Sequence, residues 1–472
     1  MQLTHDKLIS QRDTTAGNGR SSRNFRSILQ ILAVPLILVI AGLAMSIAVT
    51  TQHSDALSPS DEWVYVDYLH KFPHQGLVRQ GEPIGQESLE LMACSGVRAY
   101  GPMGPPCGGP YDDISDFPFG GVTSAYGYTP LYFAPTWLAA TAIDTITSAD
   151  FLTSARLTGA IWLALTMITL YWMFREFRVK RLVALALGLC FIGSPYSWWR
   201  YTYVTTDAPT VAITALMLIM ALRFLRGRMS GWWLVPAGTL AMLFKPSNIL
   251  TVGLIAVFLL IEAGRRWRQN RPTGISLTWR AFLSGPGPEH LVGVAAAMVI
   301  ASGVAQFLWL QVQKAIAVGL PADQGQGRPL TVADIFSQAV NFLPDTIVSN
   351  VVLYGTNTNS YAIPASIVEP LSWLTVAGVA GGIWMLSRRN SNASIISAIA
   401  ISAVAFAPLL ALMLQLTLGE YYEIPARYGA PVLAGFLLAA GLTAQNRWVS
   451  YLVLTYGTAL VIYVTVRAPV FA

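Results

Sequence analysis

Long runs of apolar residues recur along the chain, and they constrain its fold more than any other feature. The first, ILQILAVPLILVIAGLAMSIAVT at residues 28–50, carries no charged side chain. A helix needs about 20 apolar residues to cross the ~30 Å hydrocarbon layer of a membrane, whereas a transmembrane β-strand shows ~10 residues of alternating polarity. Because 54% of all residues are hydrophobic and only 11% are charged, the sequence predicts an all-α polytopic membrane protein.

The apolar runs predict about eleven transmembrane helices. The first run is longer than the apolar region of a signal peptide, and no small-residue cleavage site follows it closely, so we expect a retained helix. The predicted spans are residues 28–50, 154–174, 182–197, 208–225, 231–245, 247–262, 290–312, 368–387, 393–416, 429–444 and 448–466.

The basic residues set the expected orientation, since Lys and Arg near helix ends are held on the cytoplasmic side. With residues 1–27 as a cytoplasmic basic tail, alternate joints between spans collect 20 of the 30 basic residues and only 5 of the 24 acidic ones. The net charge of +6 is then a cytoplasmic belt, which needs no nucleic-acid partner. We expect a multi-pass protein of the cell membrane, with its N-terminus cytoplasmic and its C-terminus extracytoplasmic.

Two predicted outer loops, residues 51–153 and 313–367, are long enough to hold a functional site within the domain that we expect over residues 28–472. The first contains Cys94 and Cys107, and an oxidising compartment would permit a disulfide that stabilises the loop by about 3 kcal/mol. A metal site is the weaker interpretation, because no His lies at ligand spacing beside the pair. Cys190, inside the third span, is interpreted as a small buried residue.

An acidic pair, Asp61 and Glu62, opens the first outer loop in SPSDEWVYVDYLH. If this segment is a short interfacial helix, the helical period places Asp61, Tyr65 and Tyr68 on one stripe. The alternative is structural: an aromatic belt at the membrane surface, with Ser60 or Asp61 as the helix N-cap.

Charged side chains also stand at three other predicted outer helix ends. They are Arg200 and Asp207 in SPYSWWRYTYVTTDAPT, Lys245 in AMLFKPSN, and Glu423 and Arg427 in GEYYEIPARYGAP. Each has a structural alternative: Arg200 and Lys245 can extend to lipid phosphates, Asp207 can cap a helix, and Glu423 can pair with Arg427. The remaining apolar spans are nearly free of charge, so the gathering of these charged residues on one side of the membrane favours a functional site.

These motifs, in this order, resemble those of the GT-C superfamily of integral membrane glycosyltransferases. SPSDEWVYVDYL resembles the P-D-E start of a large group of uncharacterised bacterial GT-C-like proteins, and GYTPLYF is similar to their H-P-P-L-Y. Their outer Asp, their L-x-K-x and their late R-Y-x-x-P are similar to TTDAPT, LFKPSN and ARYGAP. The chain departs from the pattern at Tyr128 and Thr129, which replace His-Pro, and at Tyr65 or Asp67, where a His often stands.

The resemblance implies a GT-C-like fold and transfer of a sugar from a polyprenyl-phosphate donor to a glycan or glycolipid acceptor at the outer face of the membrane, in cell-envelope synthesis. A carboxylate near the anomeric carbon can take the acceptor proton. Asp61 is the first candidate for this base, and Glu62 is its alternative or the partner that raises its pKa.

The other candidate residues are divided between the two substrates. Arg427, Lys245 and Arg200 are expected to neutralise the donor phosphate by charge-assisted hydrogen bonds. Asp207, Tyr65 and Tyr128 are expected to orient the acceptor or to help hold a divalent cation, Mg²⁺ or Mn²⁺.

A transporter or flippase of lipid-linked sugars is the main competing function. It would show broken helices at the bilayer midplane and two similar halves, and the sequence indicates neither. A catalytically inactive scaffold for envelope polysaccharide assembly is the third possibility, which the acidic pair disfavours.

Overall fold

The computed structural model describes residues 17–98, 100–270, 287–322, 327–348, 364–386 and 392–467, with side chains in the first helix from Leu32 onward. The first part of the predicted basic tail, residues 1–16, and parts of the loops after residues 270, 348 and 386 lie outside the described residues.

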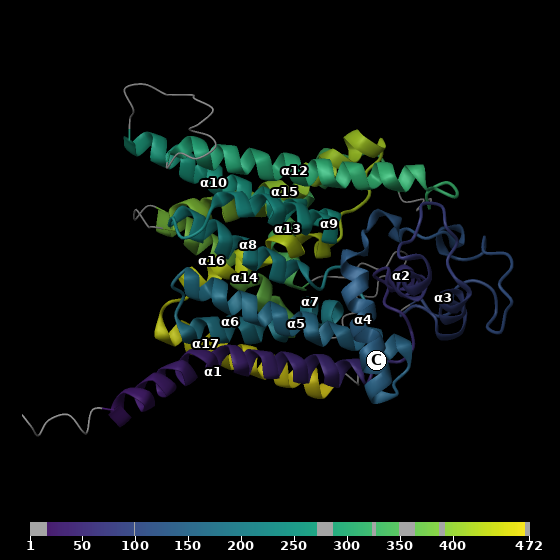
Figure 1. Ribbon diagram of the computed structural model, residues 1–472, viewed down its shortest axis with the longest axis horizontal. Coiled ribbons are helices and arrows are strands. Elements are labelled where there is room, and N and C mark those ends of the chain that lie inside the picture. The colour runs from purple at the N-terminus through teal and green to yellow at the C-terminus, as the bar shows by residue number, and fades with distance from the viewer. Residues whose placement is uncertain are drawn as a thin grey trace, which may run out of the picture.

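Helices are the regular elements of the described residues, and their order follows the predicted runs (Figure 1). Their bounds are α1 (Gly17–Thr50), α2 (Glu62–Gln75), α3 (Gln86–Glu90), η1 (Leu91–Ser95), η2 (Pro118–Gly121), η3 (Ala125–Gly127), α4 (Pro130–Thr147), α5 (Phe151–Glu176), α6 (Arg181–Ile192), α7 (Pro195–Tyr201), α8 (Thr210–Leu225), η4 (Gly231–Trp233), α9 (Leu234–Phe244), η5 (Pro246–Asn248), α10 (Ile249–Asn270), α12 (Pro288–Ala315), α13 (Val332–Val348), α14 (Ala365–Leu386), α15 (Ala393–Leu418), η6 (Ala426–Gly429), α16 (Ala430–Thr443) and α17 (Arg447–Arg467).

The prediction of an all-α, multi-pass membrane protein is confirmed. Within the described ranges, eight helices are long and apolar enough to cross a membrane, and the bent pair α6 and α7 forms a ninth candidate. Two shorter apolar helices, Thr210–Leu225 and Gly231–Phe244, fall where the fourth and fifth spans are predicted. Each predicted run therefore coincides with an apolar helix, while eleven crossings remain a prediction.

The third predicted span, residues 182–197, is not one straight helix. It breaks between α6 and α7, whose axes differ by 62°. Pro195 cannot continue a helix hydrogen-bonding ladder but suits a first helical turn. Ser194 caps the new helix, its side chain accepting from the backbone N–H of Ser197. The bend turns α7 and its Arg200 away from the axis of α6.

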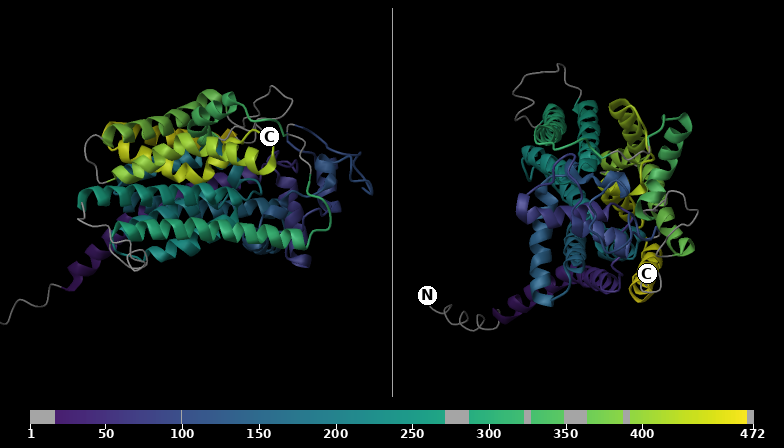
Figure 2. Two further views of the ribbon diagram at one scale, coloured as in Figure 1. Left: turned by 90° about the horizontal axis from the view of Figure 1, so that it is seen from above. Right: turned by 90° about the vertical axis from the view of Figure 1, so that its right-hand side faces the viewer.

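The described parts of the predicted cytoplasmic joints meet at one end of the helix bundle. Glu176 pairs with Arg223 there, and Lys180 donates to the carbonyl oxygen of Gln445. The long first outer loop lies at the opposite end, which is the right-hand end in Figure 1 and the near end in the right view of Figure 2. The alternation of the joints thus agrees with the prediction, and which end faces the cytoplasm rests on the distribution of positive charge.

The first outer loop folds as a unit with its own apolar core. Eight consecutive residues of α2, from Glu62 to Leu69, are buried in it, and the rings of Tyr68 and Phe133 stack with centroids 3.7 Å apart. The predicted disulfide between Cys94 and Cys107 is present. An aromatic belt facing the membrane is therefore the wrong interpretation of α2, because its rings pack inside the loop.

Candidate functional site

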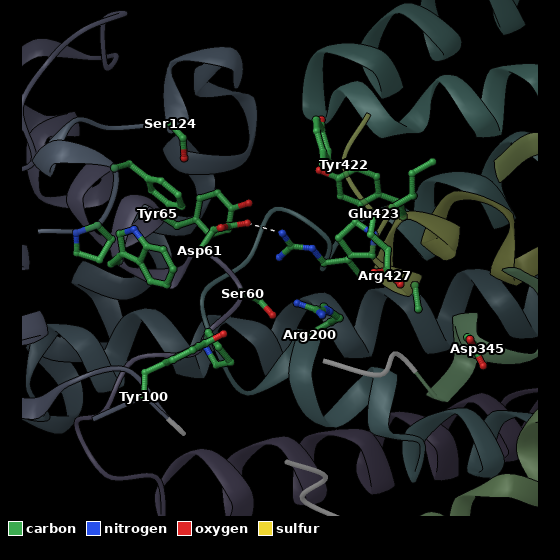
Figure 3. Close-up of a pocket in the computed structure, with 18 of the residues that line it drawn as sticks. Ser60, Asp61, Tyr65, Tyr100, Ser124, Arg200, Asp345, Tyr422, Glu423 and Arg427 are labelled. Carbon is green, nitrogen blue, oxygen red and sulfur yellow. Dashed lines mark hydrogen bonds and ion pairs between the residues drawn. The ribbon is translucent and has the colours of Figure 1, made fainter. Parts of the chain in front are cut away.

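A cavity of about 480 Å³ lies between the first outer loop and the outer helix ends. Its walls come from the start of α2, from α7, from α13 and from the segment that leads into η6 (Figure 3). Five of the predicted site residues line it: Asp61, Tyr65, Tyr128, Arg200 and Arg427. Segments that are up to 366 residues apart in sequence therefore build one site.

Asp61 precedes α2 in a left-handed backbone conformation, with φ 65° and ψ 17°. Asp is one of the few non-glycine residues that adopt this conformation readily. Asp61 occupies the N-cap position of α2, as the structural alternative predicted, but its side chain makes no capping hydrogen bond. The carboxylate instead forms an ion pair with Nη2 of Arg427 across the cavity (Figure 3).

Arg427 belongs to η6, and its guanidinium is only partly engaged. Its Nε and Nη1 atoms are buried and have no hydrogen-bond partner among the described residues. The predicted pair with Glu423 is wrong, because the ion pair formed by Arg427 within the described chain is with Asp61. Buried cationic N–H groups without a partner are costly unless an acceptor reaches them. The arrangement therefore suits an anionic ligand.

Asp207, Lys245 and Arg200 form a second, fully buried cluster beside this pair. Lys245 forms an ion pair with Asp207, and Nη1 of Arg200 lies 3.8 Å from the second oxygen of the same carboxylate. Extension to lipid phosphates is thus wrong for both cations. Asp207 does not cap α8, whose N-cap residue is Pro209. Burial alone would raise the pKa of Asp207, but Lys245, Arg200 and Arg427 outweigh it and lower that pKa.

The two clusters are connected through the ring of Tyr428. Nζ of Lys245 and the guanidinium carbon of Arg427 each lie 5.8 Å from the centroid of that ring. The predicted constellation of Asp61, Asp207, Lys245 and Arg427 is therefore contiguous. Asp61 and Arg427 line the cavity, whereas Asp207 and Lys245 lie behind its wall.

Tyr65 and Tyr128 meet at the floor of the cavity. The hydroxyl of Tyr65 lies 3.2 Å from that of Tyr128 and accepts from Oγ1 of Thr206 at 3.4 Å. Burial raises the pKa of both phenols, that of Tyr128 to about 12. Both hydroxyls therefore stay protonated at neutral pH. The hydroxyl of Tyr65 donates to that of Tyr128, which leaves the Tyr128 hydroxyl to donate to a ligand.

Glu62 does not line the cavity, although it adjoins Asp61. Its fully buried carboxylate accepts from Nε and Nη2 of Arg156 at 3.0 and 2.9 Å. Backbone N–H groups of Ser58 and Val204 donate to the same carboxylate at 2.7 and 2.9 Å. Glu62 therefore joins the first outer loop to α5 and to the segment before Asp207, which positions its neighbour Asp61.

Helix α13, in the second long outer loop, supplies one wall of the cavity that sequence reasoning missed. It begins with reciprocal hydrogen bonds between Thr331 and Asp334, the pattern of a capping box. Its cavity face carries polar residues at helical spacing: Ser337, Gln338, Asn341 and Asp345. This stripe in SQAVNFLPD was the signal that could have revealed the helix.

Two features hold α13 against the predicted site. Arg328 and Tyr421 exchange backbone hydrogen bonds of 2.9 and 2.7 Å, which ties the loop before α13 to the segment before η6. At Gly429, directly after the Arg427 motif, a side chain would overlap Thr346 of α13. A glycine is thus required where α13 meets the segment that carries Arg427.

The side chains around the cavity do not favour a bound divalent cation. Among the described residues, no three His, Cys, Asp or Glu side chains gather in a group that could hold a metal ion. The carboxylate of Asp207 faces two cations, and that of Asp61 faces Arg427. A carboxylate already neutralised by cations is a poor ligand for Mg²⁺ or Mn²⁺, so these residues do not fit a divalent cation.

Comparison with known proteins finds a family model that is similar to the part of the chain carrying three of the site residues. Residues 133–283, about one third of the chain, match the family model of dolichyl-phosphate-mannose-protein mannosyltransferases. The match confirms the resemblance to membrane glycosyltransferases of the GT-C superfamily. The matched range contains Arg200, Asp207 and Lys245, but neither Asp61 nor Arg427. No curated protein matches the chain.

Two solved structures of an oligosaccharyltransferase from Archaeoglobus fulgidus are similar to the chain over 94% of its length. One is the apo form, with 14% identity, and the other is tethered to an acceptor peptide containing the NVT sequon, with 15% identity. The TM-score is 0.44 in both comparisons, and the chain covers 56% and 55% of those proteins. The chain thus spans about half of their length.

Proposed function

We propose that the protein is a glycosyltransferase that moves a sugar from a polyprenyl-phosphate donor to a glycan or glycolipid acceptor at the outer face of the cell membrane. The observation that carries the proposal is the Asp61–Arg427 ion pair on the cavity wall, in which Arg427 keeps two buried N–H groups without a protein partner among the described residues. A base and an anion site in one cavity are what this reaction needs.

Arg427 is proposed to bind the phosphate of the donor. Its free Nε and Nη1 groups can donate to phosphate oxygens in a site of low dielectric, where charge-assisted hydrogen bonds are strong. Arg200 on the cavity wall and Lys245 behind it add positive charge, although Asp207 neutralises part of it. The phosphate competes with Asp61 for Arg427, so donor binding weakens the ion pair and frees the Asp61 carboxylate to face the acceptor.

Asp61 is proposed to be the general base. Its carboxylate takes the proton of an acceptor hydroxyl while that oxygen forms a bond to the anomeric carbon of the sugar. The bond between the anomeric carbon and the phosphate oxygen breaks, and the leaving polyprenyl phosphate carries the negative charge to Arg427. A single displacement of this kind inverts the anomeric centre, and a positioned base contributes typically 10²–10⁴ to the rate.

The acceptor is proposed to lie between α13 and the aromatic wall of the first outer loop. Trp63 and Phe119 supply apolar faces on one side, and Asn341 and Asp345 supply polar groups on the other. Tyr65 and Tyr128 can orient the hydroxyl that reacts. Polar groups around an apolar surface are the usual lining of a small-ligand site, and they suit the hydroxyl-rich faces of a sugar.

Transfer from radiolabelled polyprenyl-phosphate sugars, offered one at a time to the purified protein in nanodiscs, tests the proposal. We expect Asp61→Asn to lower the rate at least 100-fold while the donor still binds, because Asn also adopts the left-handed conformation of residue 61. Arg427→Ala should mainly raise the donor concentration needed for half-maximal rate.

The matched control is Asp112→Asn, an exposed carboxylate in the same loop that does not line the cavity, which should transfer sugar at the parental rate. Full activity of Asp61→Asn would refute the assignment of the base. Movement of the lipid-linked sugar across proteoliposomes, with its glycosidic bond intact, would instead establish a flippase.

A further inference from the structure

A second cavity, of about 490 Å³, lies at the opposite end of the bundle from the proposed active site. It opens between the turn from α5 to α6, the end of α8, the end of α10, the start of α15 and the end of α16. These are joints that the sequence places on the cytoplasmic side. Nothing in the proposed transfer reaction uses this cavity.

The wall of this cavity is strongly basic. Four cationic residues line it against one acidic residue, Glu262, and they are Arg178, Lys180, Arg226 and Arg266. The carboxylate of Glu262 is already occupied, because it accepts from Nε of Arg266 at 3.1 Å and from the hydroxyl of Ser394 at 2.6 Å. The single acid therefore leaves the other three cations uncompensated within the cavity.

The remaining cations are only partly neutralised. Lys180 donates one hydrogen bond to a backbone carbonyl, which leaves ammonium protons for a ligand. Arg226 pairs with Glu176 through Nη1 at 3.2 Å. Burial, and then the positive charges of Arg178 and Arg228, lower the pKa of Arg226. The cations therefore repel one another, and a bound anion would relieve that repulsion.

Arg178 is held at the cavity by an unfavourable backbone conformation. Its φ is 64°, in the left-handed region that favours Gly, Asn or Asp. A position that requires a turn of this kind would ordinarily be occupied by one of those residues. An Arg here sacrifices some stability, which agrees with a role for its guanidinium in binding.

The apolar floor of the cavity favours a lipid ligand over a soluble one. It consists of Leu222, Leu225, Phe258, Ile395 and Leu442. All but Phe258, which lies mid-way along α10, are in the first or last turn of an apolar helix. A soluble phosphate would leave this floor in contact with water. A phospholipid can place its phosphate among the cations and its upper acyl chain on the floor.

We propose that this cavity binds the phosphate group of an anionic phospholipid from the cytoplasmic leaflet. The recognised chemistry is a phosphodiester beside an alkyl chain, held by Arg178 and Lys180 from the turn between α5 and α6 and by Arg226 directly after α8. The site would fix the ends of these helices relative to α10 and α15 and would favour the predicted orientation in the membrane.

Retention of phosphatidylglycerol tests the proposal. The full chain is reconstituted in vesicles with 20 mol% phosphatidylglycerol in phosphatidylcholine and extracted in mild detergent, and the bound lipids are counted by native mass spectrometry. A cation near the surface strengthens binding of an anionic lipid about fivefold. We expect Arg178→Asn combined with Lys180→Gln to lower retention on the order of 25-fold. Asn suits the left-handed turn, so the variant should fold.

Arg268→Gln is the matched control, since Arg268 is exposed near the end of α10 but does not line the cavity; it should retain the lipid. Lys180→Gln alone provides a second variant with an unaltered backbone turn. Equal retention by the parent and the double variant would overturn the proposal. A second result would also overturn it: the parent retains no phosphatidylglycerol but binds inorganic phosphate tightly, and the double variant loses that binding. The ligand would then come from solution.

Discussion

Replacing Glu62 with Gln should destabilise the protein, although its neighbour Asp61 is the proposed base. Glu62 is fully buried and receives four hydrogen bonds, two of them from Arg156, which is itself 2% exposed. Gln has the same shape but no charge, and its amide presents two N–H groups where Glu62 offers an acceptor. One donor would then face another donor, and Arg156 would lose its only ion-pair partner among the described residues.

The expected cost follows from the loss of one partner of a buried ion pair, which is about 3–5 kcal/mol. Arg156 keeps hydrogen bonds of 2.8 Å to the carbonyl oxygens of Ser54 and Ala56, so we expect the lower limit, about 3 kcal/mol. That corresponds to roughly a 150-fold change in the equilibrium between native and locally open forms. The opening should begin in the first outer loop, because Glu62 joins that loop to α5.

Two properties are measured for Glu62→Gln, Asp61→Asn and the parent: the rate of limited proteolysis of the first outer loop, and the apparent melting temperature in detergent. Glu62→Gln should be cleaved much faster, whereas Asp61→Asn should lose less stability. The side chain of Asp61 is 29% exposed, which weakens its ion pair with Arg427, and Asn keeps the backbone conformation. Adding Arg156→Gln to Glu62→Gln should recover part of the loss. A Glu62→Gln variant that resists cleavage like the parent but transfers no sugar would refute the structural role.

Three further predictions concern other parts of the outer side. Burial, with the charges of Arg156 and Arg98, lowers the pKa of His53 from 6.5 to about 2. Below pH 6.5 the unfolded chain therefore binds a proton that the folded chain does not, and the free energy of unfolding should fall by up to about 1.4 kcal/mol per pH unit. His53→Gln should remove this dependence from thermal melts recorded in acid. Replacing Cys94 and Cys107 with Ser opens a link between residues 13 positions apart and should cost the loop about 3 kcal/mol, seen as faster cleavage between these positions while the bundle stays folded. Burial raises the pKa of Asp345, so its carboxylate becomes charged only as the pH rises through that raised value. Because the charged carboxylate is the better hydrogen-bond acceptor, the KM for the acceptor should fall over this pH range. Asp345→Asn should show a high KM that does not depend on pH.

The sequence predicted the class of protein because the membrane imposes a local rule. Every backbone polar group in hydrocarbon must be paired within its own helix, so a long apolar run is enough to indicate a spanning helix. The positions of the runs, the alternation of the joints and the disulfide between Cys94 and Cys107 are all present in the structure. The break at Pro195 was missed because the apolar pattern continues across it, although the Ser194-Pro195 pair was a readable signal.

The candidate site was predictable only in part, because charge alone does not tell which partners a side chain finds. The sequence indicated Asp61, Arg427, Lys245 and Asp207 as charged groups at the ends of apolar spans, where an unpaired charge is costly. It could not distinguish Asp61 from Glu62, since both are acids in the same short motif. It also gave no reason to place α13 beside Arg427, since no local pattern encodes a contact between two distant segments.

Thus the amino-acid sequence by itself determined which segments are helices in a membrane and which charged residues gather at one end. These properties follow from hydropathy and from charge, which act residue by residue. Only the tertiary structure decided that Glu62 forms an ion pair with Arg156, while Asp61 faces the cavity. It also decided that two nitrogen atoms of Arg427 have no hydrogen-bond partner within the described chain. Those outcomes depend on the directions of side chains from separate helices, which are fixed only when the helices pack together.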